Sequence, residues 1–198
     1  ILRGVVTSDA QAVRAGVSGV SDVMHYADAE DGFYEDGSFI QHEVFPYNGG
    51  YGRSLLQELA PVLYLIHQTE FDTLDTKIVY DWIDNAFFPF LTDGKCMGMV
   101  RGREISRYYE QCDYAGATIL SAMLVLSELR NGRNLKERIK AHITPAFFTY
   151  APPMASDIAA KLLQTPSDYE ETPYFKAFNR MDRAVKHGKN YTIGIAMH

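Results

Sequence analysis

Apolar residues recur every three or four positions over most of the chain, which is the period of an amphipathic α-helix. The pattern predicts helices over residues 13–24, 55–66, 79–86, 113–130, 134–142 and 154–163. Ser8 and Asp9 are candidate N-caps for the first of these helices. The longest and most apolar helix ends in a strong stop signal, Asn131–Gly132.

The pattern changes near residue 180. Two short runs with β-forming residues flank a Gly-Lys-Asn turn at residues 188–190, which predicts a β-hairpin. We therefore expect a mainly α chain. Residues 1–178 would form helical hairpins, and residues 179–198 would begin a β domain.

Residues 31–52, DGFYEDGSFIQHEVFPYNGGYG, combine glycines, aromatic rings, a histidine and carboxylates. Pro46 beside the Gly49–Gly50 pair argues against a helix. The aromatic content argues against disorder. The sequence predicts a long shaped loop, a feature that is often functional in a compact domain.

Composition narrows the function classes. The chain has 198 residues and a net charge of −6, which does not favour nucleic-acid binding. No apolar run approaches the roughly 18–20 residues that span a bilayer. The start at Ile1 and the apolar run at residues 193–197 suggest a piece of a larger protein. Cys96 and Cys112 could form a disulfide or remain free thiols.

His42 and Tyr51 lie on either side of the glycine-rich turn, and both side chains can transfer protons. The glycines would let the two side chains point into one cleft. The alternative is that His42 is a structural histidine and Tyr51 a packing ring, and the spacing alone does not separate the two.

The segment RGREISRYYEQ, residues 101–111, holds a possible anion site. If it is helical, Arg103 and Arg107 lie on one face and present two guanidinium groups to a carboxylate or sulfate. The alternative is a solvated face on which Glu104 and Glu110 pair with the arginines.

Other chemistry is weakly indicated. The sequence lacks zinc-ligand spacing, a phosphate-binding glycine loop and a G-x-S-x-G motif, so we expect no metal and no cofactor. Asp31, Glu35, Asp36 and Glu43 could include a glycosidase carboxylate pair, or they could stabilise turns. Trp82 lies on an apolar helical stripe and is expected in the core.

Three blocks of sequence resemble the polysaccharide lyase family 8 enzymes, which include hyaluronate, chondroitin AC and xanthan lyases. They are the segment at 31–52 with the following LLQEL, then RGREISR, then FNRMDRAVKHGKNYTIGIAMH. The resemblance implies an incomplete α/α toroid followed by a large antiparallel β region. It also implies β-elimination at a uronic acid of an anionic polysaccharide, outside the cell.

By motif match, Tyr51 falls on the family's general base and acid, and His42 on its partner histidine. Arg103 and Arg107 fall on cleft arginines, with Arg103 nearer the scissile bond. The expected substrate-binding residues are Arg101, Tyr47, Asn48 and Phe39.

The resemblance also implies that part of the site lies outside this chain. The family's carboxylate-neutralising asparagine would fall before Ile1, and a further glutamate and asparagine would fall after His198. We therefore expect the remaining segments of the parent chain to be partners, and this chain alone to have little activity. Two alternatives stay open: a noncatalytic carbohydrate-binding toroid and an α/α-toroid glycoside hydrolase.

Overall fold

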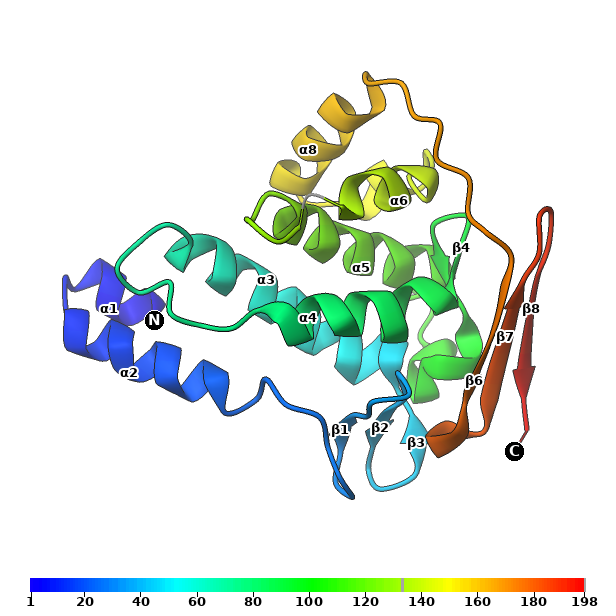
Figure 1. The fold of residues 1–198 in the computed structure, drawn as a ribbon, viewed down its shortest axis with the longest axis horizontal. Helices are drawn as coiled ribbons and strands as arrows, with labels where there is room; N and C mark the ends of the chain where they lie inside the picture. Colours follow the sequence, from blue (N-terminus) through cyan, green and yellow to red (C-terminus); the bar gives the residue numbers. More distant parts are fainter. Residues whose placement is uncertain (133, 198) are drawn as a thin grey trace.

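The computed structural model describes residues 1–132 and 134–197 (Figure 1). Its α-helices are α1 (Leu2–Val6), α2 (Ala10–Ser21), α3 (Arg53–Ile66), α4 (Lys77–Trp82), α5 (Cys112–Ser127), α6 (Leu135–Ala141), α7 (Phe147–Tyr150) and α8 (Pro153–Leu163). The predicted helices are confirmed, while the short α1 and α7 were not predicted from the sequence. Asp9 caps α2 by accepting hydrogen bonds from the backbone amides of Gln11 and Ala12.

Helix α5 forms the centre of the helical part (Figure 1). It is buried on nearly every side and packs against α3, α6, α7 and α8. This explains why its apolar residues are not confined to one stripe, since a helix that is apolar all round is a buried helix.

Helix α4 does not stop at Trp82 but continues as a π-helical turn, Ile83–Phe87, and a 3-10 turn, Phe88–Phe90. Trp82 is buried and stacks on Phe33, with ring centroids 4.5 Å apart. The prediction that Trp82 belongs to the core is confirmed.

The segment at residues 31–52 is more regular than a loop. It forms a small antiparallel sheet, β1 (Gly32–Phe33), β2 (Phe39–Gln41) and β3 (Phe45–Pro46), followed by a π-helical turn, η1 (Asn48–Gly52). The strands are too short to show an alternating apolar pattern, so the sequence did not reveal them.

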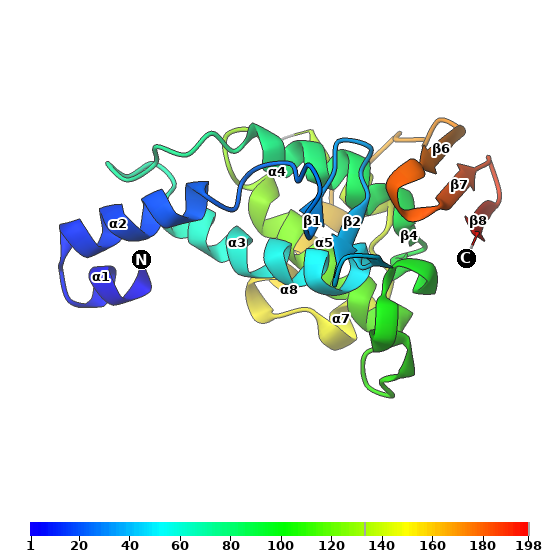
Figure 2. The ribbon, with the colours of Figure 1, turned by 90° about the horizontal axis from the view of Figure 1, so that it is seen from below.

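The C-terminal region is a three-stranded antiparallel sheet in the order β6–β7–β8. Its strands are β6 (Tyr174–Phe178), β7 (Arg183–His187) and β8 (Thr192–Ala196), and β7 with β8 is the predicted hairpin. Strand β6 was not predicted, so the β region begins before the predicted boundary at residue 179. Figure 2 shows this sheet at one end of the molecule and α1 with α2 at the other.

A further hairpin, β4 (Leu91–Thr92) with β5 (Lys95–Cys96), leads to two 3-10 turns, η4 (Gly98–Val100) and η5 (Gly102–Ser106). Hairpin strand β5 packs against α5. No helix in the described ranges is long and apolar enough to cross a bilayer.

Candidate active site

Tyr51 lies on η1, two residues before Arg53, the first residue of α3. It is partly buried, and its phenol oxygen accepts a hydrogen bond from Nη2 of Arg103 at 3.1 Å. An arginine donor aimed at a phenol oxygen stabilises negative charge on that oxygen. Residues far apart in the sequence therefore meet at one phenol, as the sequence analysis required.

His42 faces the same tyrosine. The ring centroids of His42 and Tyr51 lie 5.4 Å apart, with the planes at 89°. His42 is exposed and has a positive φ of 53°, and the next residue, Glu43, has a φ of 72°. Left-handed backbone costs free energy in residues other than glycine, so something must hold this turn.

Asp31 holds it. Its carboxylate accepts hydrogen bonds from the backbone amides of His42 and Glu43, at 3.0 and 2.9 Å. Asp36 likewise accepts from the backbone amides of Ser38 and Arg180, at 2.8 and 3.0 Å. These carboxylates therefore stabilise turns, which was the alternative to a glycosidase pair. The sequence analysis did not identify Asp31 as a support for His42.

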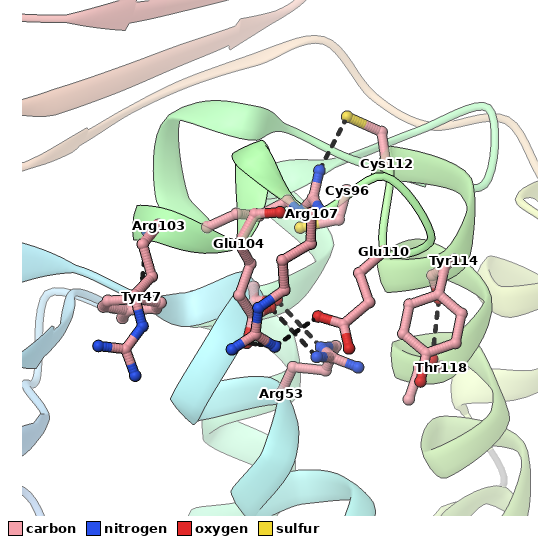
Figure 3. Close-up of polar contacts among 12 residues, drawn as sticks. Tyr47, Arg53, Cys96, Arg103, Glu104, Arg107, Glu110, Cys112, Tyr114 and Thr118 are labelled. Carbon is pink, nitrogen blue, oxygen red and sulfur yellow. Dashed lines mark hydrogen bonds and ion pairs between the residues drawn. The ribbon is translucent and has the colours of Figure 1, made fainter.

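Residues 101–111 do not form the α-helix that would place Arg103 and Arg107 on one face. The turn η5 is a 3-10 helix that ends at Ser106, and Arg107 after it has extended backbone. Figure 3 shows the Arg107 side chain beside Glu110 and the Arg103 side chain beside Tyr47. The condition for one shared helical face is therefore not met, and the alternative, pairing with Glu104 and Glu110, holds for Arg107.

The guanidinium group of Arg107 forms ion pairs with two carboxylates. Its Nη1 lies 2.7 Å from Oε2 of Glu110 and 3.8 Å from Oε1 of Glu104. The hydrogen bond and the charge of Glu110 raise the pKa of Arg107. By contrast, no carboxylate of the residues described lies within ion-pair distance of Arg103, whose side chain contacts the phenol of Tyr51. Arg103 is exposed and retains donors for a ligand.

A buried ion pair ties the two halves of the site together (Figure 3). Nη2 of Arg53, two residues after Tyr51, lies 3.2 Å from Oε2 of Glu104, one residue after Arg103. The Nε of Arg53 also donates to the carbonyl oxygen of Gly49 on η1. The sequence analysis foresaw that Glu104 could pair with an arginine. It did not identify Arg53 as the partner, because Arg53 looks like an ordinary first residue of a helix.

The four residues that were expected to bind substrate are not at the surface of this chain. Arg101, Tyr47, Asn48 and Phe39 are all buried, with exposed fractions of 1%, 2%, 1% and 5%. The side-chain amide of Asn48 donates to two backbone carbonyls and accepts from the amide of Phe39. The Arg101 guanidinium donates to the Cys112 sulfur and the Glu104 carbonyl. All four side chains therefore lie in the interior of this chain and not at its surface.

Cys96 and Cys112 are free thiols. Burial raises the pKa of Cys96 to about 12, so this thiol stays protonated near neutral pH. Among residues 1–132 and 134–197, no three His, Cys, Asp or Glu side chains cluster as a metal site would require.

Comparisons with known proteins identify the family of this chain. Residues 1–144 match the family described as polysaccharide lyase family 8, N-terminal alpha-helical domain. The chain is 33% identical to a xanthan lyase of Bacillus sp. strain GL1, over 100% of this chain and 23% of that protein. It is 27% identical to a hyaluronate lyase of Staphylococcus aureus, over 100% of this chain and 27% of that protein.

Solved structures of the same kind of lyase resemble this chain. A Paenibacillus xanthan lyase superposes with a TM-score of 0.91 at 32% identity, over 98% of this chain and 20% of that one. A Streptomyces coelicolor A3 chondroitin AC lyase, in complex with chondroitin sulphate, gives 0.86 at 29% identity, over 99% and 29%. The chain thus spans a quarter or so of its relatives' length, and the fold class predicted from the sequence, an incomplete α/α toroid, is confirmed. With the family profile covering residues 1–144 and the relatives aligned along its whole length, this chain belongs to polysaccharide lyase family 8.

Proposed function

We propose that this chain is the tyrosine-bearing part of a lyase that cleaves uronic-acid polysaccharides by β-elimination. The observation that carries the proposal is the contact of the Tyr51 phenol oxygen with Arg103, at 3.1 Å, beside the exposed His42 ring. A proton-transfer group, a cation and a second proton-transfer group thus stand together at the surface.

The chemistry begins with the proton on C5 of the uronate. Tyr51, as phenolate, takes this proton, and the electron pair of the C5–H bond forms the C4–C5 double bond. The C4–O bond breaks, and the leaving oxygen takes a proton from the same tyrosine. No water is consumed, and the tyrosine ends as the phenolate with which it began. General acid–base help of this kind contributes about a hundred- to ten-thousand-fold.

The other residues stabilise charge in this scheme. Negative charge builds up on the uronate carboxylate as the C5 proton leaves, and preorganised donors lower the barrier by meeting that charge. Arg103 has free donors close to Tyr51, and His42 can bind the carboxylate or orient the phenol. Arg107 pairs with Glu104 and Glu110, which neutralise most of its charge, so Arg103 is the arginine assigned to this task.

We propose an anionic polymer as substrate, of hyaluronan, chondroitin or xanthan type. A polymer of this size does not diffuse into a cell, so the enzyme is proposed to act outside it. Since the chain covers 20–29% of the two solved relatives, the rest of the substrate-binding surface is assigned to further segments of the parent protein.

Ultraviolet absorbance tests the proposal. The complete lyase that carries this segment is incubated with each of the three polymers, and absorbance from a 4,5-unsaturated uronate is followed. The proposal expects such absorbance from at least one polymer. New reducing ends without absorbance would instead indicate a hydrolase, and retardation in an affinity gel with neither signal would indicate a noncatalytic binder. Either result would overturn the proposal.

A further inference from the structure

Tyr47 fills the space between the segment that carries Tyr51 and the turn that carries Arg103. Its ring is 2% exposed and packs 5.0 Å from the Tyr51 ring, centroid to centroid, at 76°. The ring leaves no room for a side chain at Gly50 or Gly102, where an added Cβ would overlap it. Glycines on both segments thus form the walls of the ring's pocket.

Within residues 1–132 and 134–197, the hydroxyl group of Tyr47 has one hydrogen-bond partner. It accepts a hydrogen bond from the backbone amide of Arg103 at 2.9 Å. That amide lies in the first turn of η5, where helical N–H groups have no partner within the helix. The tyrosine therefore satisfies a donor that the turn itself leaves open.

Arg103 is consequently held at two points by two neighbouring tyrosines. Tyr47 binds its backbone, and Tyr51 accepts from its guanidinium at 3.1 Å. Because the rings of the two tyrosines pack against each other, the backbone anchor and the phenol that the guanidinium reaches are fixed relative to one another. Figure 3 shows Arg103 and Tyr47 joined at this contact.

We propose that Tyr47 is a positioning residue for the elimination reaction, acting through Arg103. This inference rests on the proposed lyase function. Tyr47 does not touch the substrate, since it is buried, and it transfers no proton. It holds the Arg103 backbone where the guanidinium meets the phenol oxygen of Tyr51, which a residue without a hydroxyl group cannot do.

The test is Tyr47→Phe in the complete lyase. Loss of one hydrogen bond that orients a catalytic contact corresponds to about a tenfold loss of rate. We expect kcat to fall about tenfold while KM changes less than about twofold, because the anchor orients the reacting groups and not the bulk of the substrate. The matched control is Tyr80→Phe, which removes a buried hydroxyl that donates to the Leu126 carbonyl on α5, with unchanged kcat expected.

A double-mutant cycle separates positioning from general support of the fold. In an Arg103→Lys background, where the planar fork is gone, Tyr47→Phe should cost less than about twofold in kcat. An equal loss in both backgrounds, or a wild-type kcat in the single variant, would overturn the proposal. If the wild-type enzyme makes no unsaturated product, the proposed function fails instead.

Amide hydrogen exchange provides a readout that does not depend on activity. In the wild-type protein the Arg103 amide should be protected, and in Tyr47→Phe its exchange should accelerate by about tenfold or more, while amides of α5 keep their rates. Unchanged protection at Arg103 would overturn the anchor itself, whatever the reaction.

Discussion

Replacing Glu104 with glutamine removes the charge that links the Tyr51 segment to the Arg103 turn while keeping the size of the side chain. The carboxylate lies 3.2 Å from the Arg53 guanidinium, and the two side chains are only 10% and 6% exposed. The change therefore leaves a buried guanidinium without a counter-charge.

The expected cost follows from this burial. Removing one partner of a buried ion pair costs about 3–5 kcal/mol. The amide oxygen of glutamine can still accept a hydrogen bond from Arg53, so we expect the lower end, about 3 kcal/mol. For a domain of this size that is a fall in melting temperature of roughly 6–12 °C.

Urea unfolding of the chain measures the change. The fluorescence of Trp82, the only tryptophan, reports on the core. The control is Glu110→Gln, which removes a partly exposed partner of Arg107 and should cost about 0–1 kcal/mol. If both variants lose the same small amount, the buried pair does not hold the site together. A double variant, Arg53→Met with Glu104→Met, should recover part of the loss, since an apolar pair needs no counter-charge.

Two further predictions concern stability. The ring nitrogens of His187 lie 3.3 Å from the Glu171 carboxylate and 2.9 Å from a backbone carbonyl; burial opposes the charge, but these hydrogen bonds raise the pKa of His187, and the same contact lowers the pKa of Glu171. The pair therefore stabilises the fold most when both side chains are charged. This contribution is lost as pH rises through the raised pKa of His187 or falls through the lowered pKa of Glu171. In urea titrations, His187→Gln should therefore lower the free energy of unfolding by about 1–2 kcal/mol more near pH 5.5 than near pH 8.5. Gly37 has a φ of 90°, and an added Cβ would overlap a backbone carbonyl, so Gly37→Ala should destabilise the fold by about 2 kcal/mol or more. Gly19 lies in α2 with open space around it, so Gly19→Ala should stabilise the fold by about 0.4–1 kcal/mol. Equal effects of the two substitutions would refute this reasoning.

The sequence revealed the parts of the fold that repeat an apolar pattern over several turns. The helices α2, α3, α5, α6 and α8 and the hairpin β7–β8 were predicted in this way. Strand β6 is as long as β7 and β8, but it lies outside the two runs that flank the predicted turn and it follows Pro173. The small sheet at residues 31–46 escaped for a similar reason, as each strand has only two or three residues.

The site was predicted through residue types and resemblance, and its supports were not. Tyr51, His42 and Arg103 meet as expected. The helix considered at residues 101–111 does not form, since Gly102 has a φ of 50°, outside the region that a right-handed α-helix uses. Whether Tyr47 turns its ring toward solvent or toward Gly102 depends on contacts between segments more than fifty residues apart, which no local pattern encodes.

The central claim is that the Tyr51 phenol performs the proton transfers of the elimination. The most direct measurement compares the rate of ultraviolet absorbance gain by the complete lyase with and without the substitution Tyr51→Phe, together with the affinity of each for the polymer. The control is Tyr64→Phe, which changes an exposed tyrosine on α3. The account predicts that Tyr51→Phe loses turnover by at least about a hundredfold with affinity nearly unchanged, and that Tyr64→Phe behaves as wild type. Normal turnover by Tyr51→Phe would contradict it.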